Sequence, residues 1–182
     1  MQAMRQTSLK PQDVVILTKL CGYPTSKPPT YSVIASEIEI STAEVAGGIK
    51  RLRSAQLVQP NDGASPILDA TKEFLVHGIK YMFPPVFGTM RRGIATSYAA
   101  PPLSDLIVLN KDKGNIPVWP YPQGTSRGFA LTPLYPTVPI ACLRDQSLYQ
   151  KLALIDAIRS GSTRERELAI KLLVERLDNA PV

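Results

Sequence analysis

The sequence predicts a mainly α-helical protein with a small amount of β structure, and three observations support this. Residues 11–83 alternate helical apolar patterns with short turn signals. Residues 84–139 hold ten of the 17 prolines, which exclude long helices there. Residues 143–177 return to helical spacing. We therefore expect three parts: a first domain over 1–83, an extended proline-rich layer with short strands over 84–142, and a C-terminal helical pair over 143–182 that serves dimerisation.

The composition is that of a chain that packs a core and carries excess positive charge. Apolar residues make up 44% of the sequence, and no apolar run approaches the ~20 residues that span a bilayer. The net charge of +6 suits a polyanionic partner such as nucleic acid. The polar N-terminus has no apolar signal core, so we expect a cytoplasmic protein.

The first two helices are marked by the residues at their ends. Pro11 suits a first helical turn, because a backbone N–H at that position would have no acceptor within the helix and its absence costs no hydrogen bond. Gly22 ends that helix. Thr30 can cap a second helix over residues 31–38. The inner face of this second helix is expected to be apolar and to lie on the core.

A third helix is predicted over residues 42–55, after a tight turn at Glu39. Ser41 is its N-cap, and Glu44 completes a capping box in which each side chain accepts the other residue's backbone N–H. Apolar residues spaced by four and three form its core stripe. They are Val45, Ile49 and Leu52.

A short hairpin and a fourth helix are expected next. Residues 57–59 and 66–68 read as two strands joined by turn residues, and a helix over 70–83 follows until Pro84 stops it. Helix, helix, tight turn, helix and hairpin is the order of a winged helix-turn-helix, whose third helix enters the DNA major groove.

The stretch from about residue 11 to 83 resembles the winged-helix modules of MarR-type bacterial transcriptional regulators. The apolar spacing and the capped third helix carry this resemblance. One departure is Glu39 in the turn, where such modules often have glycine, so we expect a slightly different turn there. The resemblance implies double-stranded DNA as the partner.

The outer side of the third helix supplies the candidate DNA contacts. Lys50, Arg51 and Arg53 can neutralise phosphates, and Lys50 could also reach a guanine edge. The positive end of the helix can hold a phosphate. The full candidate set is Tyr31, Ser32, Ser41, Thr42, Ala43, Ala46, Gly47, Lys50, Arg51, Arg53, Ser54, Arg91 and Arg92. The last two would touch flanking phosphates if their loop folds beside the third helix; otherwise they belong to a solvated loop.

Two features of this module leave alternatives open. Gly47 and Gly48 could allow close approach to DNA, or they could pack tightly against the second helix. The loop over residues 61–65 has no basic residue, and Asp62 would repel phosphate. The alternative function is therefore a winged-helix adaptor that binds a protein partner and does not read DNA.

The remaining sequence predicts strands, then helices. Strands are expected over 106–109 and 127–131. A helix starts at Asp145 or Ser147, and a second follows a capping box at Ser162. These two helices bury their apolar faces either on the proline-rich layer or against a second copy. Three aromatic residues suit core packing better than a ligand pocket: Trp119, Tyr121 and Tyr135.

Nothing in the sequence points to an enzyme. His77 is the only histidine, and there is no phosphate-binding glycine loop, nucleophile elbow or metal-ligand set. Cys21 and Cys142 lie in apolar runs and read as buried free thiols. We expect no catalytic residue, no metal ion and no cofactor.

These observations predict a cytoplasmic transcriptional regulator of bacterial or phage origin. We expect a homodimeric repressor or autoregulator with one recognition helix for each half-site. Its size and architecture also fit an antitoxin-like protein or the regulator of a defence locus. The protein-binding adaptor is the alternative.

Overall fold

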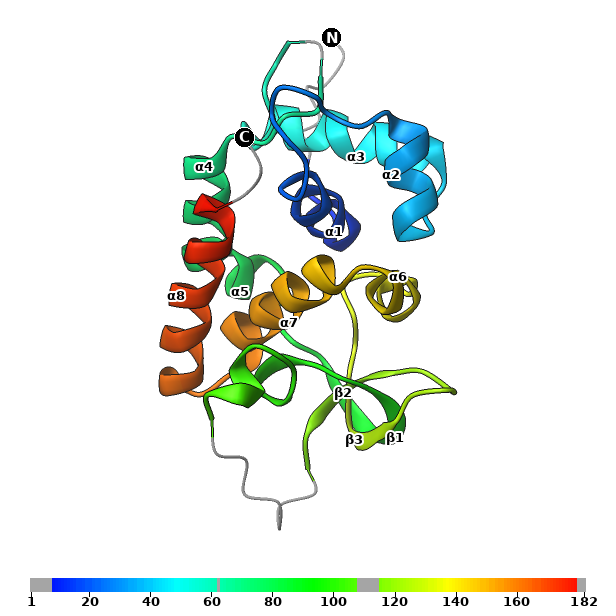
Figure 1. Cartoon of the computed structure of the whole chain (residues 1–182), viewed down its shortest axis with the longest axis vertical. Helices are drawn as coiled ribbons and strands as arrows, with labels where there is room; N and C mark the ends of the chain where they lie inside the picture. The colour runs from blue at the N-terminus through cyan, green and yellow to red at the C-terminus, as the bar shows by residue number, and fades with distance from the viewer. Residues whose placement is uncertain (1–7, 62, 108–114, 180–182) are drawn as a thin grey trace, which may run out of the picture.

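The computed structural model of the chain describes residues 8–61, 63–107 and 115–179. Helices predominate in the described part and a small sheet completes it, which confirms the predicted mainly α-helical class with a small amount of β structure. The first helices lie at one end of the long axis and the sheet at the other, with the C-terminal helices between them (Figure 1).

The three predicted N-terminal helices are present: α1 (Pro11–Leu20), α2 (Tyr31–Ile38) and α3 (Thr42–Ser54). The hydroxyl of Thr30 accepts the N–H of Val33 at 3.4 Å, and that of Ser41 accepts the N–H of Glu44 at 3.2 Å. The predicted core stripe of α3 is fully buried. Capping side chains and apolar spacing therefore fix this end of the molecule.

The turn between α2 and α3 is made without glycine. Glu39 itself adopts the left-handed conformation, with φ 57° and ψ 40°. The N–H of Ile40 then bonds to the carbonyl of Ala35 at 3.1 Å, which closes the end of α2. The glutamate thus takes the conformation that glycine adopts most easily.

The predicted hairpin after α3 is reduced to a single β-bridge between Val58 and Pro66. The second predicted strand is cut short because Leu68 already begins α4 (Leu68–Glu73). That helix continues through a π-helical turn, Phe74–Gly78, into α5 (Ile79–Met82). The predicted fourth helix is therefore present but begins earlier. Asp62 lies outside the described residues.

The sheet consists of β1 (Phe87–Ala95), β2 (Pro117–Pro120) and β3 (Ser126–Leu131). Strand β1 runs antiparallel to both others, which pair in parallel with each other, so the sheet closes on itself.

Strand β3 was predicted. The loop expected around Arg91 is instead a nine-residue strand. Leu106 and Ile107 are not in a strand, and the rest of the predicted strand 106–109 lies outside the described residues.

Two glycines allow so small a sheet to close. A Cβ on Gly93 would lie 2.0 Å from the carbonyl oxygen of Trp119, and one on Gly128 would lie 1.9 Å from that of Ile116. No Cβ atom fits at such a distance. The neighbouring backbones can therefore approach this closely only because both positions are glycine, which has no side chain.

The C-terminal part contains α6 (Val138–Arg144), α7 (Gln146–Ser160) and α8 (Thr163–Asp178). Asp145 caps α7, and a complete capping box at Ser162 begins α8, as predicted; α6 was not predicted. Helix α7 is buried on all sides from Lys151 to Arg159 and lies against α1 and α8. Its apolar stripe therefore lies in the core of its own chain. Among the helices described, none has the length and apolar character to cross a membrane.

A buried carboxylate joins α7 to the sheet. Asp156 is 2% exposed and accepts hydrogen bonds from the Thr96 hydroxyl at 2.8 Å and the Trp119 indole N–H at 2.7 Å. Arg159 donates to the same carboxylate at 2.7 Å, and it also donates to the carbonyl oxygens of residues 83 and 84. One helical turn of α7 thus holds the chain on both sides of β1, at residues 83 and 84 before the strand and at Thr96 after it.

Replacing Asp156 by alanine should lower the free energy of unfolding by about 3–5 kcal/mol, because it leaves a buried arginine and an indole N–H without their acceptor. Urea denaturation followed by far-UV circular dichroism measures this loss. Asp105, which is exposed, is the matched control, and its alanine variant should stay within about 0.5 kcal/mol of the wild type. Equal losses in the two variants would contradict the assigned role of the Asp156 carboxylate.

Candidate nucleic-acid interface

The side of α3 that faces away from α1 is exposed and small. Thr42, Ala43, Lys50 and Ser54 are exposed there, with Ala46 and Gly47 half-buried beside them. The structure therefore brings these predicted contact residues together on one surface, which we call the α3 face. Of the predicted residues on α2, Ser32 is exposed and Tyr31 is half-buried.

Arg51 does not belong to the α3 face. Its Nε and Nη2 atoms donate to the two carboxylate oxygens of Asp13 on α1, at 2.7 and 2.6 Å. The Asp13 carboxylate has no exposed surface, and it also accepts the backbone N–H of Lys10 at 2.8 Å. The prediction of a phosphate contact is thus not supported for Arg51, because its guanidinium fastens α3 to the core.

Arg53 is also engaged within the chain. Its guanidinium donates to the carbonyl oxygens of Gln59 at 3.3 Å, Asn61 at 3.4 Å and Gly63 at 3.0 Å. These bonds hold the loop after α3 against the helix. Of the three predicted phosphate-binding cations on α3, Lys50 alone is exposed with no ion pair to another described residue.

The two glycines of α3 play different roles. A Cβ on Gly48 would lie 2.5 Å from Cδ1 of Ile16 and 3.0 Å from a carboxylate oxygen of Asp13. A Cβ on Gly47 would meet only Nη1 of Arg51, at 3.4 Å. Gly48 therefore allows tight packing, although against α1 and not against α2 as expected, while Gly47 leaves the α3 face flat.

The acidic residue in the first turn of α3 points at the body of the protein. The Glu44 carboxylate accepts the hydroxyl of Ser41 at 3.2 Å and that of Tyr135, from the proline-rich layer, at 3.3 Å. The predicted capping box is therefore only half formed. The Ser41 hydroxyl accepts the backbone N–H of Glu44, but the Glu44 carboxylate bonds to the Ser41 hydroxyl and not to the Ser41 backbone N–H. Half-buried Glu44 leaves the α3 face without an exposed carboxylate.

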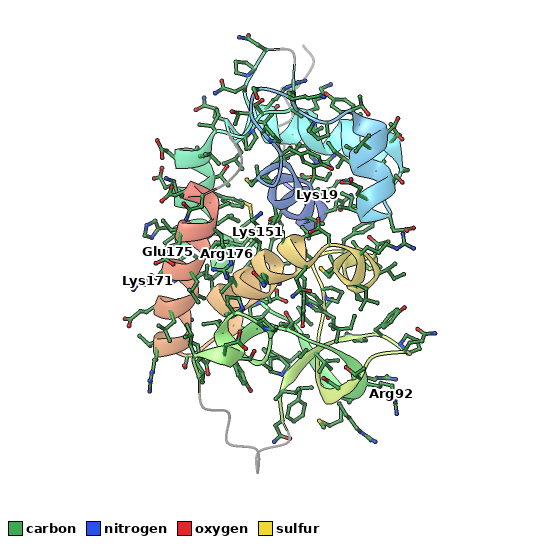
Figure 2. The ribbon with its side chains drawn as sticks, in the orientation of Figure 1. Lys19, Arg92, Lys151, Lys171, Glu175 and Arg176 are labelled. Atoms are coloured by element: carbon green, nitrogen blue, oxygen red, sulfur yellow. The ribbon has the colours of Figure 1, made fainter. Side chains whose placement is uncertain are left out.

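Arg91 and Arg92 do not lie beside α3. They are exposed on β1, at the end of the molecule opposite α3, where Figure 2 shows Arg92. The condition for their predicted contact with flanking phosphates is therefore not met. Sequence reasoning missed Arg127, which pairs with Arg92 across β1 and β3 and stands 35 residues away in the sequence. No local signal could have joined them.

A second feature missed by the sequence is a polar cavity of about 250 Å³ between α1 and the start of α7. Lys19 on its wall pairs with Glu37 at 2.8 Å and with Asp145 at 2.6 Å. Lys151 is only 5% exposed, and its Nζ donates to the hydroxyl of Ser147 at 3.0 Å. Both lysines are labelled in Figure 2. Lys151 is thus a buried cation without an ion pair to any carboxylate in the described residues.

The groups considered for chemistry occupy unreactive positions. Cys21 and Cys142 are buried free thiols, as predicted, and burial raises the pKa of Cys21 to about 12. A thiol with so high a pKa is a poor nucleophile at neutral pH. His77 is exposed on the π-helical turn. Within residues 8–61, 63–107 and 115–179, no three His, Cys, Asp or Glu side chains gather as metal ligands.

Comparison with known proteins gives no match: no family model, no curated protein and no solved structure is similar to this chain.

Replacing Arg51 by alanine should lower the free energy of unfolding by about 3 kcal/mol, because Asp13 would remain buried without its cation. Lys50→Ala, one residue away and exposed, is the control and should change stability by less than about 0.5 kcal/mol. Urea denaturation compares the two variants. If Arg51→Ala were as stable as Lys50→Ala, the ion pair could not be what fastens α3 to α1.

Replacing Lys151 by methionine should stabilise the protein at pH 7. Burial lowers the pKa of Lys151, outweighing the opposite effect of Cys21 and Asp145 nearby. A lysine whose pKa is lower in the folded state destabilises it most at pH values below that pKa, and this destabilisation fades as the pH rises toward the ordinary value of 10.5.

The urea midpoint of Lys151→Met should therefore exceed that of the wild type at pH 7, and the difference should shrink at pH 10. Lys171→Met, on the exposed side of α8, should give no gain at either pH. If the gain in urea midpoint grew with pH, or if there were no gain at pH 7, burial of the charged Lys151 would not be what destabilises the folded protein.

Proposed function

We propose that this protein binds double-stranded DNA through a winged helix-turn-helix formed by α1–α3 and the bridged loop after α3, and that it regulates transcription. Helix α3 is the recognition helix in this proposal and α2 is the helix that braces it. The observation that carries the proposal is the α3 face, which is exposed, small and free of exposed carboxylates while every bulky apolar side chain of the helix turns inward.

The packing of α3 supports this role because it holds the helix in one position. The Asp13–Arg51 pair fastens it to α1, and Arg53 fixes the following loop to it. A helix that is held rigidly loses little conformational entropy on binding. Its small residues, with Gly47 at the centre, let the backbone come close to the groove.

The same face limits how DNA can be read. Lys50 is the one long cation on it, and the hydroxyls of Ser41 and Thr42 lie at the positive end of the helix. So few hydrogen-bonding groups give modest base readout, and DNA shape supplies more of the specificity. A single module of this kind binds weakly, which fits a homodimer on a two-fold site.

A protein-binding adaptor is the second candidate, and a stretch of the chain rich in exposed apolar side chains favours it. Tyr81 is 76% exposed, and three further apolar side chains near it in the sequence are also exposed: Met82, Val86 and Phe87. Apolar groups gathered on a surface are typical of protein interfaces. An adaptor would show no preferred DNA duplex.

Selection of bound duplexes from a random pool, followed by fluorescence anisotropy with the selected duplex, tests the DNA-binding proposal. We expect Lys50→Glu to weaken binding at least about 10-fold, because it replaces a phosphate-binding cation by an anion. Lys50→Ala should reduce the slope of log affinity against log salt by about 0.9, the value for one phosphate contact.

Lys171→Glu is the matched control, since it reverses an exposed lysine on α8, far from α3 (Figure 2). It should bind the selected duplex as the wild type does. The absence of any enriched duplex, or equal binding by the Lys50→Glu and wild-type proteins, would overturn the DNA-binding role of α3.

A further inference from the structure

The β1–β3 pair presents a basic and apolar face at the end of the molecule opposite α3. In its register Arg92 stands opposite Arg127, and Met90 stands opposite Phe129. Because side chains two residues apart on a strand point to the same side, these four lie together on one surface. We call this surface, made of Met90, Arg92, Arg127 and Phe129, the ribbon face.

The ribbon face carries positive charge that the chain does not neutralise. Arg92 and Arg127 are exposed, and neither forms an ion pair with another described residue. The sequence contains no Asp or Glu over residues 74–104 or 114–144, which include the whole sheet. Like charges directly opposite each other destabilise a strand pair, so this arrangement is unfavourable until an anion binds.

Apolar surface lies directly beside these arginines. Phe129 is 40% exposed and Met90 is 37% exposed, although they face each other across the strands. A hollow of about 280 Å³ opens next to them. Its lining is Met90, Arg91, Arg92, Thr125, Ser126 and Arg127. Three arginines and two hydroxyl-bearing residues thus line this hollow, and the exposed ring of Phe129 stands opposite Met90 on the neighbouring strand.

We propose that the ribbon face binds single-stranded nucleic acid, with phosphates on Arg92 and Arg127 and a base stacked on Phe129. A duplex hides the flat faces of its bases, and an acidic peptide has none, so neither would use the exposed ring. Arginine and aromatic groups side by side are the combination that binds single strands without a fixed sequence. DNA and RNA strands share this chemistry. This site is separate from the α3 face and does not depend on the proposed duplex binding.

The test is fluorescence anisotropy with a labelled oligothymidylate of about 20 nucleotides, using the full chain. The wild type should bind it with strong salt dependence. Arg92→Glu/Arg127→Glu should weaken binding more than about 10-fold, and Arg92→Ala/Arg127→Ala should reduce the salt slope by about 1.4, which is about 0.7 for each phosphate contact. All four changes are on exposed side chains, and unaltered far-UV circular dichroism establishes that the variants are folded.

Phe129→Ala measures the contribution of base stacking to binding, because it removes the aromatic ring and leaves both arginines in place. It should weaken oligothymidylate binding by about 5-fold or more while leaving the salt slope unchanged. In the Lys50→Glu protein, whose α3 face binds duplex more weakly, a same-length DNA duplex and a poly-glutamate peptide should bind more weakly than the single strand. Oligoribouridylate in place of oligothymidylate distinguishes RNA from DNA as the preferred strand, and preference for either one supports the proposal.

Two controls make the result specific. Arg164→Glu reverses an exposed arginine on α8 and should leave binding unchanged. Lys50→Glu should do the same, so a failure of duplex binding at α3 is distinguished from a failure here. The proposal is overturned if the Lys50→Glu protein binds the duplex or the acidic peptide as tightly as the single strand, if Phe129→Ala binds as the wild type does, or if Arg92→Glu/Arg127→Glu keeps full affinity.

Discussion

The buried carboxylate of Asp156 is the constraint on which the arrangement of the whole chain depends. An isolated carboxylate cannot be taken out of water without several donors, and here the donors come from Thr96 directly after β1, from Trp119 on β2 and from α7 itself. Arg159, one turn on, reaches back to the end of the N-terminal helices. These bonds fix the position of the sheet on α7, and the α3 face and the ribbon face are therefore held at opposite ends of the molecule (Figure 1).

The second constraint is the ion pair between Asp13 and Arg51. It separates Arg51, whose charge serves the fold, from the neighbouring Lys50, which is exposed to solvent. A charged run such as Lys50-Arg51 reads in a sequence as a single basic patch. In three dimensions the two side chains lie about 100° apart around the helix and meet different surroundings.

Local signals were enough to predict the helices except α6. Thr30, Ser41, Asp145 and Ser162 each cap a helix where the sequence places them, because a cap involves only residues three apart. Strand β1 lacked such a signal. Six consecutive residues on it are exposed, so the apolar alternation that marks a strand is missing. Its pairing depends on Gly93 and Gly128, whose need for close backbone contact is visible only once the partners are known.

The sequence predicted which side of α3 is exposed, but not which of its charged side chains are free to bind a partner. The α3 face lies where the sequence placed it, whereas the partners of Arg51 and Arg53 are up to 38 residues away in the chain. The ribbon face combines residues from two strands that a long stretch separates, so only the fold brings Arg92 to Arg127. The result is a molecule with a flat, weakly charged surface at one end and a strongly basic, partly aromatic one at the other.

The position of Trp119 has a practical consequence. It is the chain's single tryptophan, it is 1% exposed, and its indole N–H is bonded to Asp156 while its ring lies 5.8 Å from that of Tyr149. Its intrinsic emission therefore originates at the joint between sheet and α7 and nowhere else. Any partner that loosens this joint would change the wavelength of that emission, so the protein carries an unlabelled optical reporter of its own internal assembly.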